Sequence, residues 1–130
     1  GCLDMVNFYG PDSVPTKYKD AGRVFYQHNP QVTLMRTTPS ECEKIGAAIA
    51  ERLNLSRAPV TVLLPLKAIS VISAPGQKFH DPAADKALFD ALKRGLRKDI
   101  PVIEKESAIN DPEFAEACVS ALLANLKKTA

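Results

Sequence analysis

Apolar side chains recur at helical spacing in three segments of the chain, and each segment follows a recognisable helix start. In the first, Thr38 and Glu41 form a capping box and Pro39 takes the first helical position. Cys42, Ile45, Ile49 and Leu53 then follow at spacings of 3, 4 and 4, which makes one apolar stripe. We predict a helix from Pro39 to Asn54, whose small residues allow it to pack closely on a sheet: Gly46, Ala47, Ala48 and Ala50.

The other two helix starts are Asp81–Pro82 and Asp111–Pro112, each a capping residue followed by proline. The helix after Asp81 places an apolar row inward, formed by Leu88, Phe89, Leu92 and Leu96. The helix after Asp111 carries two adjoining apolar rows and ends in two lysines, which suit a helix carboxyl terminus. Its rows are Phe114, Cys118 and Leu122, and Ala115, Val119, Leu123 and Leu126.

Short apolar or β-branched runs precede the three helices. Val24–Gln27, Val60–Leu64 and Pro101–Glu104 have the composition of strands, whereas residues 1–20 have turn signals and at most a short turn around Thr16–Lys19. Strand and helix thus alternate three times, which favours parallel pairing with right-handed crossovers. We predict an α/β fold, a three-layer sandwich with a small, mainly parallel Rossmann-like sheet and helices on both faces.

The bulk composition narrows the possible functions. A chain of 130 residues is predicted to form a single α/β domain with its own core. The net charge is +2 with both signs interspersed, which argues against a nucleic-acid partner, and no apolar run approaches the roughly 20 residues of a membrane span. Three cysteines without paired spacing suit reduced thiols in a cytoplasmic protein, and no metal site is predicted.

Polar residues gather after the predicted strands. In a parallel sheet the loops 28–38, 65–81 and 106–111 leave from the same edge, where open α/β sheets bind anionic ligands. Arg36 beside Thr37 and Thr38 offers a fork of donors to a phosphate or carboxylate, and Lys67 offers a point charge. Alternatively, Thr38 is only a helix cap, Arg36 is solvated, or Lys67 acts as a base. His28, Asn29, Asn110 and Asp111 complete the candidates from these loops, although Asp111 is first of all a helix cap.

Several standard catalytic motifs are absent from the sequence. It contains no GxGxxG, no GxxxxGK[ST], no GxSxG and no HExxH. The sequence therefore gives no support for standard dinucleotide, P-loop, esterase or zincin chemistry.

Four ordered strings resemble a known family. GCLDMVNF (residues 1–8), HNPQVTLMRTT (28–38), VLLPLKAIS (62–70) and INDPEFA (109–115) are similar to the second half of an uncharacterised bacterial, fungal and plant protein family. Its plant representative is the ATP-binding amino-terminal region of the tomato mosaic virus resistance protein. His80 and Ser107–Ala108 depart from the pattern expected of the family.

The resemblance implies a longer, two-domain protein with a cleft between its domains, of which residues 1–130 are most of the second domain. We expect a nucleotide-binding protein, with ATP as the implied cofactor and this chain as one wall of the cleft. The partners expected are a small anionic ligand or nucleotide, the amino-terminal domain and a second copy in a homodimer. The expected ligand-binding residues are Asp4, Asn7, His28, Asn29, Thr33, Arg36, Thr37, Thr38, Lys67, Ser70, Asn110 and Asp111.

Two alternative functions remain open from the sequence. One is an enzyme acting on a small phosphorylated or carboxylated metabolite, with Lys67 or His28 in acid/base work. The other is a structural oligomerisation domain without a ligand. The sequence identifies neither a substrate nor a reaction.

Overall fold

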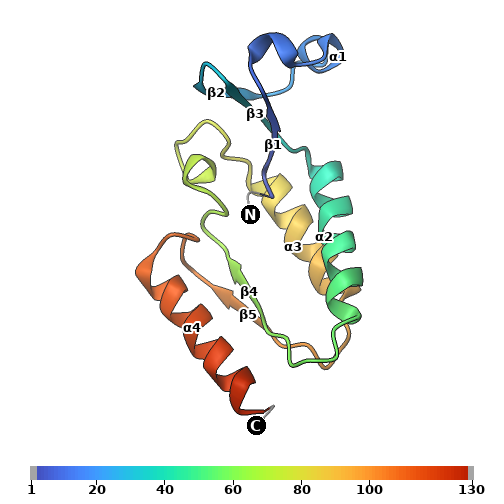
Figure 1. The fold of residues 1–130 in the computed structure, drawn as a ribbon, viewed down its shortest axis with the longest axis vertical. Coiled ribbons are helices and arrows are strands. Elements are labelled where there is room, and N and C mark those ends of the chain that lie inside the picture. The colour runs from blue at the N-terminus through green and yellow to red at the C-terminus, as the bar shows by residue number, and fades with distance from the viewer. Residues whose placement is uncertain (1–2, 129–130) are drawn as a thin grey trace.

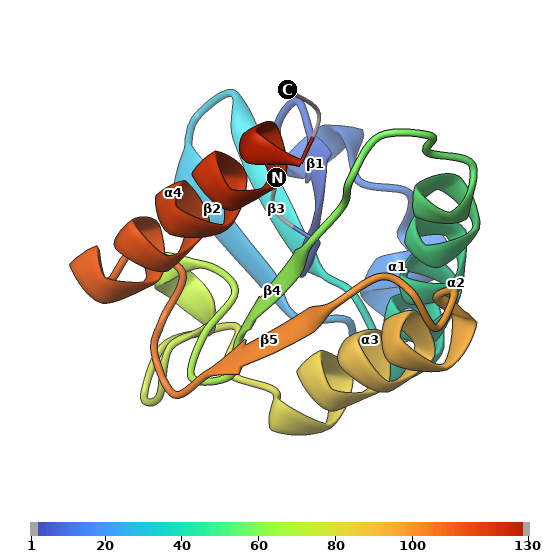
Figure 2. The same cartoon turned by 90° about the horizontal axis from the view of Figure 1, so that it is seen from below.

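A computed structural model describes residues 3–128 and shows three layers (Figure 1). In the middle layer, β4 (Val62–Pro65) and β5 (Val102–Lys105) pair in parallel. Helices α2 (Pro39–Asn54) and α3 (Pro82–Gly95) lie on one side of this pair and α4 (Pro112–Lys127) on the other, as both views show (Figure 2). The predicted α/β class is confirmed, and so are the starts of all three helices.

A second sheet lies beyond the amino-terminal ends of α2 and α3 (Figure 1). It contains β1 (Met5–Phe8), β2 (Phe25–Asn29) and β3 (Val32–Arg36) in the order β1-β3-β2, and both pairings are antiparallel. A short helix, α1 (Thr16–Asp20), and a 3-10 turn, η1 (Pro11–Ser13), connect β1 to β2. A further 3-10 turn, η2 (Val71–Ser73), lies between β4 and α3.

The antiparallel sheet corrects the expectation that the first predicted strand joins the parallel sheet through a loop at residues 28–38. That segment is instead a tight turn followed by β3. The Asn29 side chain accepts the Gln31 N–H at 2.8 Å and Pro30 carries no N–H, so the chain reverses and β2 pairs with β3. Along β3, Thr33 and Met35 are buried, which is the period-2 pattern of a strand.

Helix α2 begins with the predicted capping box. The Glu41 N–H donates to Thr38 Oγ1 at 3.3 Å, and the Thr38 N–H donates to a Glu41 carboxylate oxygen at 2.8 Å. Asp81 caps α3 as expected, since it accepts the Ala84 N–H at 3.0 Å. Asp111 is the N-cap residue of α4, but its side chain forms no hydrogen bond to the start of the helix. Its carboxylate instead accepts the Ala108 N–H at 2.8 Å and so holds the loop in front of the helix.

The small residues of α2 allow a close approach to another helix rather than to a sheet. A Cβ atom built on Gly46 would lie 2.4 Å from the Leu88 carbonyl oxygen of α3. Cys42 and Ala50 are buried in the same contact, whereas Ala47 and Ala48 are exposed. The core contains Leu64 from β4 and Leu88, Phe89 and Leu92 from α3, together with Ile100.

No helix among residues 3–128 is long and apolar enough to cross a membrane.

Substituting Gly46 by alanine tests the close contact between the two helices. We expect Gly46→Ala to lower the free energy of unfolding by about 1–3 kcal/mol, because steric overlap outweighs the better helix propensity of alanine. Urea denaturation followed by circular dichroism measures the change. The exposed Ala47→Gly is the control and should cost about 1 kcal/mol through propensity alone. A Gly46→Ala protein as stable as the parent would contradict the close contact.

The charge on Glu41 makes the start of α2 sensitive to pH. Burial by itself would raise the pKa of this carboxyl group. The Thr38 N–H donates to the carboxylate at 2.8 Å, and the Arg23 guanidinium donates to it at 2.6 and 3.1 Å. Together these donors outweigh burial and lower the pKa below its ordinary value of 4.5. The ionised carboxylate therefore stabilises the fold above the unfolded-state pKa, and this stabilisation is lost as the pH falls through the folded-state pKa.

We expect Glu41→Gln to lower the free energy of unfolding by about 0.5–1 kcal/mol at neutral pH, since glutamine keeps the capping geometry but loses the ion pair. The difference from the parent should shrink as the pH falls through the lowered folded-state pKa of Glu41. Glu43→Gln, which breaks an exposed pair with Arg94, is the control and should change little at either pH. Equal differences at both pH values would rule out the charge of Glu41 as the cause.

Candidate functional site

The parallel pairing of β4 and β5 continues into the two loops that follow these strands. Ala68 and Ala108 form an isolated parallel bridge, the Lys67 N–H donates to the Ser107 carbonyl at 3.1 Å, and the Ile109 N–H donates to the Ala68 carbonyl at 2.9 Å. The loops after both strands therefore leave together from one edge of the sheet. This is the place where open α/β sheets bind their ligands.

Residues from these two loops and from the antiparallel sheet line one pocket, which we call the Tyr26 pocket. Its volume is about 360 Å³. Its polar groups are His28 on β2, Ser70 on the loop after β4 and Asn110 on the loop after β5. The rest of the lining is apolar or aromatic: Met5, Tyr26, Leu34, Ile69, Val71, Ile72 and Ile109.

Two aromatic contacts position the Tyr26 ring. The His28 ring lies 6.3 Å from it, and the Phe79 ring contacts it edge-on, also at 6.3 Å between centroids. Tyr26 and His28 both line the pocket, and the pairing register of β2 with β3 shifts between Gln27 and Asn29. The pocket therefore has a flat, largely apolar wall with an imidazole at one end.

Two hydrogen bonds fix the Ser70 hydroxyl, which lines the Tyr26 pocket. Its hydroxyl donates to a carboxylate oxygen of the fully buried Asp4 at 2.5 Å and accepts the Ser73 N–H at 3.1 Å. The other oxygen of Asp4, Oδ1, is buried and has no hydrogen-bond partner among the described residues. Asp4 thus adjoins the pocket through Ser70 and orients its hydroxyl.

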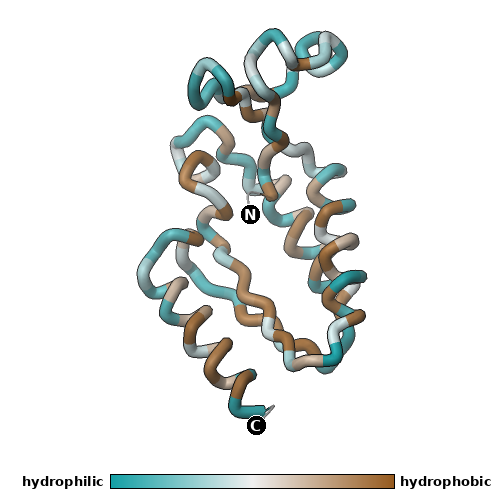
Figure 3. The backbone as a smooth tube through the Cα atoms, viewed as in Figure 1, coloured by the Kyte–Doolittle hydropathy of each residue, from teal (hydrophilic) through white to brown (hydrophobic). Residues whose placement is uncertain are grey.

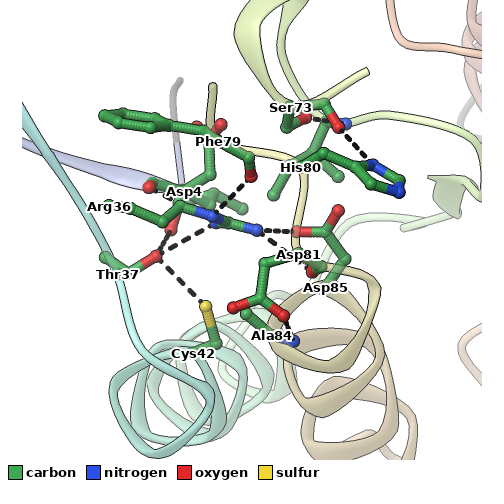
Figure 4. Close-up of polar contacts among 12 residues, drawn as sticks. Asp4, Arg36, Thr37, Cys42, Ser73, Phe79, His80, Asp81, Ala84 and Asp85 are labelled. Atoms are coloured by element: carbon green, nitrogen blue, oxygen red, sulfur yellow. Dashed lines mark hydrogen bonds and ion pairs between the residues drawn. The ribbon is translucent and has the colours of Figure 1, made fainter. Parts of the chain in front are cut away.

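Arg36 has a different environment from the open fork of donors that the sequence suggests. The side chain is 5% exposed, and all three guanidinium nitrogens donate to protein acceptors (Figure 4). Nε donates to the Phe79 carbonyl at 2.9 Å, one terminal nitrogen to the Asp4 carbonyl at 3.3 Å, and the other to Asp85 at 2.5 Å. Arg36 joins β3 to the start of α3, so we do not include it in the candidate site.

Two titratable groups around Arg36 are shifted by burial. Burial raises the pKa of the Asp85 carboxyl group, and the Arg36 guanidinium opposes this rise without cancelling it. Burial likewise raises the pKa of the Cys42 thiol, whose sulfur lies 3.2 Å from Thr37 Oγ1. A thiol that stays protonated is a poor nucleophile and a poor metal ligand.

Lys67 lines a different cavity from His28, which we call the Lys67 cavity. Its volume is about 310 Å³, and it lies between α3 and the ends of β4 and β5. Lys86 and Lys93 in its lining form ion pairs with Asp90 and Glu104, whereas Lys67 Nζ has no ion pair or hydrogen bond among residues 3–128. His80 also lines this cavity and its Nδ1 lies 3.1 Å from the Ser73 carbonyl oxygen.

The remaining predicted site residues lie outside both cavities. Asn7 is exposed on β1, and Asn29 forms the turn between β2 and β3. The Thr37 hydroxyl donates to the Leu3 carbonyl, and Thr38 caps α2. The Asp111 carboxylate accepts the Ala108 N–H in the loop before α4. Thr33 is buried on β3, and its hydroxyl lacks a partner within the described part of the chain.

Sequence reasoning missed most of the apolar lining of the Tyr26 pocket. Tyr26 lies two residues before His28 in the sequence, and this closeness was the available signal. Ile69, Ile72 and Ile109 carry no polar chemistry that marks a site. Residues 3–128 contain no group of three or more His, Cys, Asp or Glu side chains that could hold a metal ion, and Cys2 lies outside the described residues.

Removing the Arg36 guanidinium tests its structural role. We expect Arg36→Ala to lower the free energy of unfolding by about 3–5 kcal/mol, because Asp85 and several carbonyl oxygens are left buried without their donor. Arg94→Ala, which removes one partner of an exposed pair with Glu43, should cost less than about 1 kcal/mol in the same urea titration. Similar losses in the free energy of unfolding for the two variants would show that Arg36 does not hold β3 to α3.

Relatives of this chain are found in bacteria and plants. A UPF0261 protein of Rhizobium meliloti is 51% identical over 123 residues, covering 93% of this chain and 30% of that protein. A UPF0261 protein of Clostridium tetani is 43% identical over 129 residues, covering 98% and 31%. The ToMV resistance protein Tm-1 of Solanum lycopersicum is 42% identical over 127 residues, covering 95% and 16%.

These matches confirm the resemblance seen in the four sequence strings. The chain spans about a third or less of the length of the relatives it matches. The model of the C-terminal domain of the uncharacterised protein family UPF0261 matches residues 1–126. The chain therefore belongs to the UPF0261 family.

Proposed function

We propose that this chain forms one wall of a binding site for a small anionic ligand that carries a flat ring, of the nucleotide class, and that the Tyr26 pocket takes the ring. The observation that carries the proposal is the convergence of His28, Ser70 and Asn110 on one mostly apolar pocket. These residues come from three separate segments, and two of the segments follow parallel strands.

The shape and lining of the pocket support a ring-bearing ligand. Its volume of about 360 Å³ falls within the range of small-molecule sites, roughly 300–1,000 Å³. Such sites combine an apolar or aromatic lining with a few placed polar groups. The Tyr26 ring offers a flat face, the three isoleucines offer aliphatic contacts, and the Asn110 amide offers the directional hydrogen bonds that select one ring over another.

An anionic ligand also needs a positively charged group near its phosphates. None of the described residues lining the Tyr26 pocket is lysine or arginine, so phosphate groups of a nucleotide would extend beyond it. Lys67 lies two residues before Ile69 and its ammonium group is exposed. In this proposal, the part of the longer family protein outside this chain forms the opposite wall of the site. The family resemblance implies such a two-walled cleft, with ATP as its ligand.

Titration calorimetry with the chain tests the proposal. We expect ATP, ADP or adenosine to bind with enthalpy changes that a ring-free phosphate such as pyrophosphate does not produce. Asn110→Asp should weaken binding of the nucleotides by about tenfold, because a carboxylate at the rim repels an anion and loses the amide donor. Gln77→Glu, the same change of charge at an exposed position outside the pocket, should leave the affinity unchanged.

Equal affinity in both variants would exclude the Tyr26 pocket as the binding site. The Lys67 cavity is a second candidate, since Lys67 is a cation without a counterion among the described residues. If pyrophosphate or a small carboxylate binds and Lys67→Gln abolishes this binding, an enzyme or binding protein for a small anionic metabolite fits better. No response to any ligand would favour a structural role.

A further inference from the structure

Strand β4 has the composition of a central strand but only one neighbour. Among residues 3–128 it pairs with β5 alone. Val62 and Leu64 are buried, and Figure 3 shows apolar residues along this strand. Strands of a parallel sheet that are covered on both faces are apolar in this way. β5 instead carries Glu104 and Lys105, and charged side chains are typical of a strand at the edge of a sheet. β5 therefore has the character of an outer strand and β4 that of an inner one.

The backbone of β4 has free hydrogen-bonding groups on the side away from β5. The Val62 N–H donates to the Pro101 carbonyl and the Leu66 N–H to the Lys105 carbonyl, both at 2.9 Å. Because backbone groups of successive residues in a strand point to opposite sides, those of Leu63 point away from β5. They form no backbone hydrogen bond within the described part of the chain. Unpaired backbone groups along a strand are a template for a further strand.

An apolar groove lies along this free side of β4, and we call it the β4 groove. Of the described residues, all four of β4 line it and none of β5 does. Ile49 and Leu53 of α2 and Phe114 of α4 also line it, so it lies between the two helix layers of the domain. Every described residue that lines it is apolar. A space beside a strand edge, with helices on both sides, has the surroundings of a strand in a three-layer fold.

The start of the described chain indicates which segment occupies the groove. Leu3 lines the groove, and the next residue, Asp4, accepts the Ser70 hydroxyl at 2.5 Å, beyond the carboxyl end of β4. A segment that reaches Leu3 through the groove therefore runs from the amino end of β4 to its carboxyl end, parallel to β4. The family model that matches this chain is that of a C-terminal domain, so in the family further chain precedes it.

The handedness of the connections selects the same side of β4. Helix α3 connects the parallel strands β4 and β5, and α2 lies on the same side of the sheet (Figure 2). Crossovers between parallel strands are right-handed in almost all proteins. Two successive crossovers on one face therefore step across the sheet in one direction. A parallel strand that precedes α2 and is connected through it to β4 then lies on the side of β4 away from β5, where the β4 groove is.

We propose that the segment immediately upstream of residue 1 in the full-length protein forms a strand in the β4 groove, parallel to β4. This strand makes β4 the centre of a three-stranded parallel sheet. About five residues suffice, since a strand rises about 3.3 Å per residue. Leu63 offers the N–H on this side of β4, because Pro65 has none. The new strand ends beside Ser70, at the edge that holds the Tyr26 pocket, but the inference does not require a ligand there.

Amide hydrogen exchange resolved to single residues tests the strand by comparing this chain with the full-length protein. We expect exchange of the Leu63 N–H to be about a hundredfold slower in the full-length protein, because this group gains a hydrogen bond within the sheet. Val102 and Glu104 are the matched controls. Their N–H groups point to the outer side of β5, so their exchange should be the same in both proteins. Fast exchange at Leu63 in the full-length protein, or equal slowing at all three residues, would overturn the proposal.

A pair of variants separates backbone pairing from simple burial of the groove. Leu63→Pro and Leu63→Ala both remove the leucine side chain, but only proline removes the N–H. The extra loss of melting temperature in the proline variant should be several degrees larger in the full-length protein than in this chain. An equal extra loss in both proteins would contradict a paired strand. Protection of the Leu63 N–H in this chain alone that grows with protein concentration would show that a second copy covers the edge, which also overturns the proposal.

Discussion

The fold depends on the buried ion pair between Arg36 and Asp85. Arg36 is the final residue of β3, the central strand of the antiparallel sheet, and Asp85 lies in the first turn of α3. The ion pair therefore joins the antiparallel sheet to helix α3. The same guanidinium also holds the Phe79 and Asp4 carbonyl groups, which belong to the segments that border the pocket (Figure 4). A buried arginine with every nitrogen occupied imposes one geometry, because any displacement leaves a charge or a carbonyl without its partner.

The two cavities differ in chemical character. The segment from Leu66 to Asp81 borders both: its middle part lines the Tyr26 pocket, and its ends line the Lys67 cavity. The first cavity is an apolar recess with a few placed hydrogen-bonding groups, and the second is a charged recess with one unpaired lysine among its described residues. In our proposal the ring of a nucleotide takes the apolar recess, and its phosphate groups lie outside that recess.

The chain is about a third or less of the length of its relatives, and this changes what its surfaces mean. A pocket open on one side suits a site that a further part of the protein completes, and a strand with a free edge suits a further strand. In our proposals these surfaces differ in chemistry: the pocket combines aromatic and amide groups, whereas the β4 groove is apolar with unpaired backbone groups along one side. Ligand binding and strand pairing can therefore be tested independently.

The sequence by itself determined the three helix starts, the helix bounds of α2 and the order of strands and helices from β4 onward. These features rest on local signals, namely caps, prolines and apolar periodicity, which act within a few residues. Only the tertiary structure decided that residues 32–36 form an antiparallel strand, that Arg36 meets Asp85 across 49 residues, and that His28, Ser70 and Asn110 share a pocket while Lys67 lies in another. The physical reason is that strand pairing and buried charge compensation are contacts between distant segments, and a residue's own neighbours in the chain do not specify the partner that satisfies it.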